Sequence, residues 1–190
     1  MTSIDDQLVD KPPVAVARPA LDAGLADGLR AGRSVRMIVD GVSMYPALRP
    51  GDAVWLAPIR PEGPRVGEIV VCALPAGYLC HRVIWAARGR VRTKGDNNRG
   101  ADPAQPVTAL LGRVVAVERD GRRMDLTTSR AQAAAISLAL WGLAEWLIFR
   151  SGRSLSRPLQ AANPQLTRRL VAWQRQMSVQ VRGWLGRLVG

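Results

Sequence analysis

The stretch that decides the fold of this 190-residue chain is Gly41-Val42-Ser43-Met44-Tyr45-Pro46-Ala47-Leu48-Arg49-Pro50-Gly51-Asp52. Gly41 can adopt a positive φ or admit a second backbone at close range. Met44 is an apolar, flexible side chain suited to lining a groove, and Pro46 biases the residue before it towards extended geometry. The closing Pro-Gly-Asp is typical of a turn that leads into a strand. The stretch therefore predicts that Ser43 is exposed on a loop beside a strand.

Two further segments supply a base and acids. His81, the only histidine, stands in His-Arg-Val-Ile, and the segment Lys-Gly-Asp-Asn-Asn at 94–98 is followed by Asp102. A serine hydroxyl needs a base within hydrogen-bond reach, and neutral imidazole can take its proton and return it to a leaving amine. A carboxylate on the far ring nitrogen fixes the tautomer. Asp96 and Asp102 both follow His81 closely enough to compete for that role.

Together the three segments resemble the signal peptidase I superfamily of serine proteases, in its archaeal and endoplasmic-reticulum branch, where a histidine replaces the bacterial lysine. The resemblance covers roughly residues 34–118. It implies that Ser43 is the nucleophile, His81 the base and Asp102 the third triad member, with Asp96 as a supporting acid that orders its loop. It also implies cleavage after small residues and an oxyanion hole built on the Ser43 N–H. Some relatives add a hydroxyl two residues before the nucleophile, which Gly41 lacks.

The function that this resemblance implies is a serine endopeptidase that removes a signal or leader segment from a precursor polypeptide. The alternative is a catalytically weak peptide- or membrane-binding module that retains the peptidase fold. The superfamily also includes self-cleaving repressors, but residues 1–33 are too short for a DNA-binding domain and show no helix-turn-helix pattern. No cofactor is expected, because one histidine, two cysteines and no Gly-rich phosphate loop argue against a dedicated metal or nucleotide site.

Charge and composition bear on partners. The formal net charge is +12, with a sequence pI of about 11.4, and most of the basic residues are arginine. Such a balance suits an anionic membrane, nucleic acid or acidic substrates, and an arginine-rich genome would produce it as well. We expect a polypeptide precursor as substrate and an anionic membrane surface as a partner of the C-terminal helices, with no specific nucleic acid.

The expected fold is mostly β with peripheral helices: a signal-peptidase-like antiparallel β domain with one main core, followed by a helical, basic amphipathic tail. Short β-branched or alternating runs separated by Gly and Pro turns predict the strands. Residues 1–19 have no apolar segment typical of a signal peptide and read as a flexible leader. Leucines at 21, 25 and 29 predict a short helix over 21–31. The predicted strands are 34–40, 53–57, 68–74, 78–85, 90–93, 112–118 and 122–126.

One hairpin makes a prediction about the two cysteines. A tight turn at Pro75-Ala76-Gly77 with a symmetric register would place Cys72 opposite Cys80. The pair would then be either two buried free thiols or a disulfide. His81 would point to the face opposite to that of Cys80.

The chain divides into a leader and short helix (1–33), the β domain (34–127) and a helical extension (128–190). Residues 131–149 match the length of a membrane span, but Glu145 is costly in lipid, so an amphipathic or buried helix is the other interpretation. Residues 151–163 predict a loop, and 166–189 a basic amphipathic helix that lies on a membrane or packs on the protein. The expected location is cytoplasmic or peripheral to the cytoplasmic membrane, with a span at 131–149 as the alternative.

Overall fold

The computed structural model describes residues 19–74 and 77–162. Helix α1 (Pro19–Arg30) precedes the strands, and helix α2 (Ser129–Ala162) follows them; a single turn of 3-10 helix, η2, covers Val107–Ala109. The strands are β1 (Val35–Ile38), β2 (Ala53–Ala57), β3 (Ile69–Leu74), β4 (Gly77–Ala87), β5 (Arg90–Lys94), β6 (Gln105–Pro106), β7 (Leu110–Arg119) and β8 (Arg122–Asp125).

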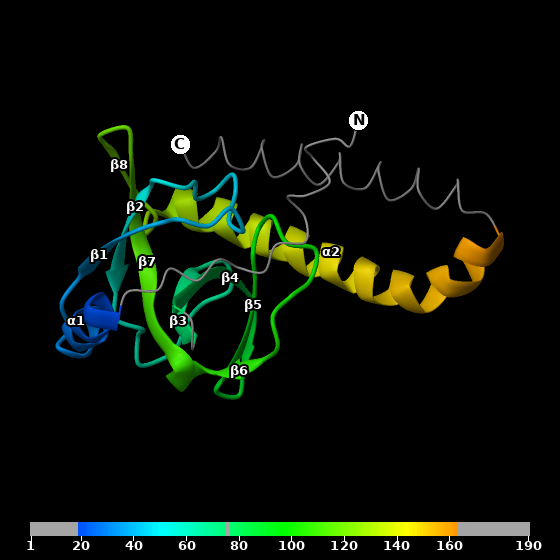
Figure 1. Ribbon diagram of the computed structural model, residues 1–190, viewed down its shortest axis with the longest axis horizontal. Helices are drawn as coiled ribbons and strands as arrows, with labels where there is room; N and C mark the ends of the chain where they lie inside the picture. Colours follow the sequence, from blue (N-terminus) through cyan, green and yellow to red (C-terminus); the bar gives the residue numbers. More distant parts are fainter. Residues whose placement is uncertain (1–18, 75–76, 163–190) are drawn as a thin grey trace.

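The strands form one antiparallel sheet in the order β1-β2-β7-β3-β4-β5-β6, with β8 paired to β7. Figure 1 shows the sheet curving beneath helix α2. The seven predicted strands are confirmed, as expected where short alternating runs are separated mostly by Gly and Pro turns. The eighth, β6, was not predicted, since two residues are too few to show an alternating pattern.

The buried apolar side chains form two clusters rather than the one main core that was predicted. The first core gathers side chains from α1, β2, β3, β7 and the Ser43 loop, and the second gathers side chains from β3, β4, β5 and β7. Val71 belongs to the first core and Val70 to the second. Because successive side chains of a strand point to opposite faces, β3 separates the two cores, which explains its continuous apolar run.

Helix α1 covers the first core, as its leucine spacing predicts. Leu25 and Leu29 are both buried in that core. The position of Gly112 on β7 is closely approached by Leu29, whose nearest methyl carbon would lie 3.1 Å from a Cβ placed there. The short helix therefore packs directly on the β domain.

The predicted pairing of the two cysteines is wrong by one residue. Cys72 pairs with Leu79, and Cys80 pairs with Val71. Leu74 pairs with Gly77, so the strands are joined by two residues rather than three, and a one-residue shift moves a side chain to the other face. The thiols thus point to opposite faces and are free. His81 also faces away from Cys80, as predicted.

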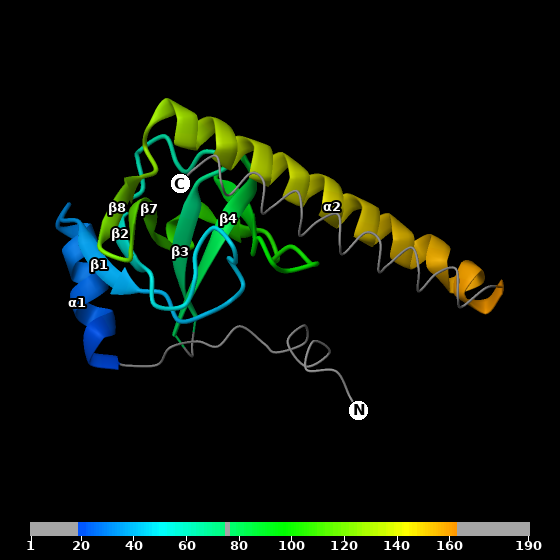
Figure 2. The ribbon, with the colours of Figure 1, turned by 90° about the horizontal axis from the view of Figure 1, so that it is seen from above.

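The predicted loop at 151–163 is wrong, because helix α2 runs without interruption from Ser129 to Ala162. The strong helix breakers in that range are Gly152 and Pro158, and the helix continues through both of them. Figure 2 shows that the first half of α2 lies along the sheet and the remainder extends past the strands. No helix among the described residues is long and apolar enough to cross a membrane. The predictions for 1–18 and 166–189 lie outside the described residues.

Candidate active site

Three segments far apart in the sequence bring a serine, a histidine and an aspartate into one hydrogen-bonded row. The Nε2 atom of His81 lies 3.1 Å from the Oγ atom of Ser43, and its Nδ1 atom lies 2.7 Å from Oδ2 of Asp102. Ser43 comes from the loop after β1, His81 from β4 and Asp102 from the segment after β5. Ser43 is half-buried and His81 is 2% exposed. The serine hydroxyl thus lies partly open to solvent, while the histidine ring is held inside the protein.

Asp102 is fixed by the strand that precedes it. Thr93 donates its hydroxyl to Asp102 Oδ2 at 2.6 Å, and the Asp102 N–H donates to the Thr93 carbonyl at 2.8 Å. Arg92 donates to the Asp102 carbonyl at 2.8 Å. With the far ring nitrogen of His81 directed at this carboxylate, the Nε2 atom is left to accept the serine proton.

Asp96 forms a different ion pair, so the structure separates the two acids that the sequence left in competition. Arg82 donates from Nε and Nη2 to the two carboxylate oxygens of Asp96 at 2.8 and 2.6 Å, and from Nη1 to the Gly67 carbonyl at 2.8 Å. Arg82 and Asp96 are both buried. Such two-point Arg–carboxylate pairs fix orientation as well as charge, and this one holds the start of the loop at 95–98.

The loop at 95–98 in turn supports the backbone of Ser43. The Asn97 N–H donates to the Ser43 carbonyl at 2.7 Å. The same carbonyl lies so near Gly95 that a Cβ there would be 2.7 Å from it. The Gly-Asp-Asn-Asn segment therefore supports the Ser43 backbone, and its glycine is required because the Ser43 carbonyl comes too close to allow a Cβ.

A second ion pair closes the Ser43 loop from the other side. Arg119 of β7 donates to Asp52 at 2.9 and 2.6 Å and to the Ala47 carbonyl at 3.1 Å, and the Arg49 N–H donates to Asp52 at 2.7 Å. Burial by itself would raise the pKa of Asp52, but the hydrogen bonds from Arg119 and from the Arg49 N–H outweigh it and hold that pKa below its ordinary value. The pair is therefore charged and ties the loop to the sheet.

The residues predicted to meet the substrate or the oxyanion are only partly placed where expected. Met44 does not line a groove: it is 2% exposed and belongs to the first core, since a flexible apolar side chain also fills an interior. Gly41 adopts no positive φ, and a Cβ there would meet nothing within 4 Å. Pro46 is half-buried in the turn after Ser43. The exposed apolar side chains beside the serine are Val42 and Tyr45, which the sequence analysis did not single out.

The cysteines do not compete with Ser43 as nucleophiles. Burial raises the pKa of Cys80 to about 12 and raises that of Cys72 above its ordinary value. A thiol attacks as the thiolate, so both side chains stay in the unreactive form near neutral pH. Among the described residues, no three or more His, Cys, Asp or Glu side chains are grouped to hold a metal ion.

Several supporting residues were missed from the sequence. Thr93 and Arg82 read as ordinary strand residues, and only the folded sheet shows which acid each one binds. Glu145 did carry a signal, since it is the single charge in residues 131–149 and a buried charge requires a partner. That partner, Lys94, is 51 residues away and could not be identified from spacing.

A comparison of the chain with protein-family models gave no match, and a comparison with curated proteins gave none either.

Proposed function

We propose that the chain is a serine endopeptidase that removes a signal or leader segment from a precursor polypeptide. The observation that carries the proposal is the hydrogen-bonded row Ser43–His81–Asp102, with 3.1 Å and 2.7 Å between the paired atoms. These are the distances at which a base can take a hydroxyl proton and an acid can orient the base. The resemblance of the three segments to signal peptidases supplies the substrate class.

In the acylation step, Ser43 Oγ attacks the scissile carbonyl carbon while its proton passes to His81 Nε2. The carbonyl oxygen becomes an oxyanion, for which the Ser43 main-chain N–H is the proposed donor; within the described residues no hydrogen bond occupies that N–H. His81 then gives the proton to the leaving amine, which departs and leaves an acyl ester on Ser43. Asp102 stabilises the imidazolium formed between these transfers.

In the deacylation step, a water molecule gives its proton to His81 Nε2 and attacks the ester. The tetrahedral intermediate collapses, His81 returns the proton to Ser43 Oγ, and the new carboxyl terminus leaves. The protein supplies position and charge stabilisation in both halves, and atoms and protons balance without a cofactor.

The substrate would approach as an extended chain. Strand β1 is at one edge of the sheet and leads to the Ser43 loop, and an edge strand can pair with an incoming peptide through main-chain hydrogen bonds. Ile38 at the end of β1 and Val42 and Tyr45 around the serine are exposed apolar side chains suited to a hydrophobic segment. An exported preprotein and a small peptide precursor both have this character. Action in the cytoplasm or at the cytoplasmic membrane surface, with the basic C-terminal segment on anionic lipid, belongs to the same proposal.

The test is mass spectrometry of a signal- and leader-peptide library after incubation with purified protein, with Ser43→Ala as the control. Serine-dependent cuts after small residues would support the peptidase, and the cut positions would narrow the substrate class. A folded wild-type protein that makes no cuts with a membrane mimic present would overturn it.

A second candidate is a peptide-binding module with little turnover. The observation in its favour is that Gly41 supplies no hydroxyl to an oxyanion, and the loss of one such donor costs about 2.7–4 kcal/mol of transition-state stabilisation. This candidate predicts that Ser43→Ala keeps the biological activity and binds peptides as the wild type does. Loss of the biological activity in that variant would exclude it.

A further inference from the structure

Helix α2 packs backbone to backbone against the sheet beside the site. A Cβ placed on Gly67, before β3, would lie 2.8 Å from the main-chain nitrogen of Ile136 on α2. Gly142 of α2 faces Ile84 and the Lys94 side chain, with 3.6 and 3.7 Å to the nearest carbons of each from a Cβ placed there. The contact at Gly67 is too close for a Cβ, so glycine there allows α2 to approach, whereas a Cβ on Gly142 would make ordinary van der Waals contacts.

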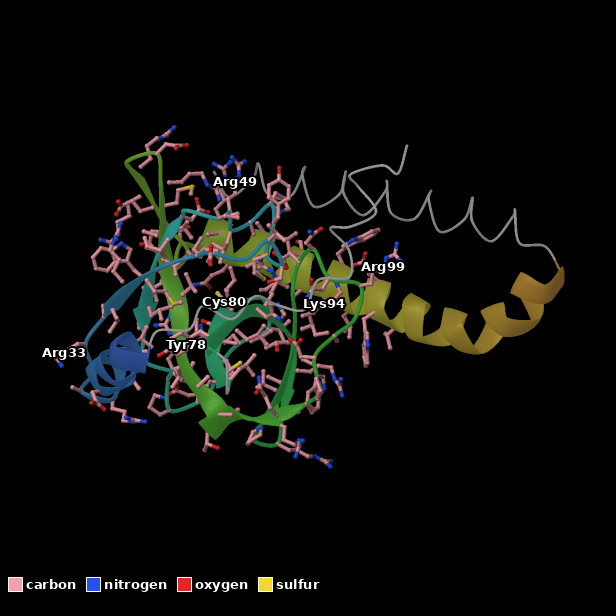
Figure 3. All side chains as sticks on the ribbon, in the orientation of Figure 1. Arg33, Arg49, Tyr78, Cys80, Lys94 and Arg99 are labelled. Atoms are coloured by element: carbon pink, nitrogen blue, oxygen red, sulfur yellow. The ribbon has the colours of Figure 1, made fainter. Side chains whose placement is uncertain are left out.

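A buried ion pair joins α2 to the end of β5. Lys94 Nζ donates to Glu145 at 2.8 Å, and the two side chains are 2% and 8% exposed. Figure 3 shows Lys94 beside α2. Neither charge is tolerated alone in such a place: removal of one partner from a buried pair costs about 3–5 kcal/mol. The pair therefore fixes where α2 and β5 meet.

Both residues that α2 engages on β5 lead directly to the triad. Lys94 precedes Gly95, and the loop that starts there supports the Ser43 carbonyl through the Asn97 N–H. Arg92 lies 4.9 Å from the ring centroid of Trp146 on α2, and the same guanidinium donates to the Asp102 carbonyl. Glu145 and Trp146 are adjacent in sequence, so one turn of α2 reaches the backbones of two triad members.

We propose that Glu145 of helix α2 is a positioning residue: through Lys94 it sets the loop that holds Ser43, so that the docking of α2 governs turnover. Only the effect on turnover rests on the proposed function; the effect on the loop does not. Partners or surfaces that move α2 would then change the rate at Ser43 without touching the site. A cavity wall shared by Glu145 and Asp96 brings the ion pair next to the Arg82–Asp96 pair that holds the same loop.

The test uses the full chain with Glu145→Gln, which removes the carboxylate to which Lys94 donates, and Glu145→Asp, which keeps a carboxylate at this position. The control is Glu68→Gln, which removes the carboxylate that pairs with Arg60 and Arg113 and whose described hydrogen bonds come from Arg60 and the Arg65 N–H rather than from the loops at 41–52 and 95–98. Two readouts are measured on samples with the same fraction of folded protein. The first is amide hydrogen exchange of Asn97, and the second is kcat and KM for a cleaved peptide.

Glu145→Gln is expected to speed exchange at Asn97 and to lower kcat about tenfold or more with KM little changed, because small displacements of a catalytic group are costly. Glu145→Asp should recover most of both, and Glu68→Gln should change neither beyond its effect on global stability. Unaltered Asn97 exchange in Glu145→Gln, or lost stability with normal kcat per folded molecule, would overturn the inference. If the wild type cleaves nothing, the proposed function fails, and the Asn97 exchange alone decides the inference.

Discussion

Gly95 lies directly against the main-chain carbonyl of Ser43: a Cβ on Gly95 would be 2.7 Å from that oxygen and 2.9 Å from the side-chain amide of Asn98. Real Cβ atoms do not make contacts this short, and the atom contacted belongs to the backbone of Ser43, which cannot move aside as a flexible side chain could. The glycine of the Gly-Asp-Asn-Asn segment is therefore present to seat Ser43, although the sequence alone presents it as a turn residue.

Replacement of Gly95 by alanine should displace Ser43 and lower kcat by about 10–100-fold, because misplacement of the nucleophile by about 1 Å costs that order of rate. Peptide cleavage assays with the purified variant measure it. The control is Gly100→Ala, in the same connection, where a Cβ would meet nothing within 4 Å. Equal rates for the two variants would contradict the proposed contact.

Replacement of Asp102 should lower catalysis, whereas replacement of Asp96 should lower stability. Asp102→Asn should lower kcat by about 10⁴-fold with the fold retained, since the wrong histidine tautomer is then favoured. Asp96→Asn removes the counter-charge of buried Arg82 and should cost about 3–5 kcal/mol of unfolding free energy. Kinetics and urea denaturation of both variants measure the two effects, and a reversed ranking would exchange the roles assigned to these residues.

Gly41→Ser should raise the rate. The position has ordinary backbone geometry and free space around a Cβ, so a serine fits, and its hydroxyl can donate to the oxyanion. Because the loss of such a donor costs about 10²–10³ in kcat elsewhere, a gain of about tenfold or more is expected. Gly41→Ala, which adds the carbon without the donor, is the control, and an equal effect of both would refute a role for the hydroxyl.

Ser43→Ala and His81→Ala should abolish cleavage to the same residual level, and the double variant should lose no more. Triad members act as a unit, so their effects on kcat do not add. Single-turnover assays on the three proteins measure this. Additive losses would mean that Ser43 and His81 act in separate steps.

Acid should destabilise the fold through Asp52. Its pKa is lowered in the folded protein from a value of 3.8, so the folded state binds this proton less well than the unfolded state. The stabilisation is complete above about pH 4 and is lost as the pH falls through the lower folded-state pKa. Asp52→Asn should cost about 1.5–3 kcal/mol at neutral pH, the range for hydrogen bonds to charged groups, and should flatten this acid limb. Urea unfolding from pH 2 to pH 7 measures both; an unchanged acid limb would exclude Asp52 as its origin.

The sequence by itself determined the strands and the candidate residues of the site. Alternation and Gly or Pro turns are local signals, so seven strands and the helix with Leu25 and Leu29 could be predicted from them. The motifs around Ser43 and His81 indicated a candidate nucleophile and a candidate base for the same reason, because these are recognisable by residue type, and they left Asp96 and Asp102 as competing acids.

Only the tertiary structure decided which acid meets His81, that Met44 is part of the core, and that Cys72 and Cys80 face apart. Each depends on register or on contacts between distant segments, and a shift of one residue reverses the face of a strand. The pairing of Glu145 with Lys94 across 51 residues likewise depends on a contact between distant segments. A charge in an apolar segment predicts that a partner exists, because buried charges are paired, but only the folded chain determines which residue that partner is.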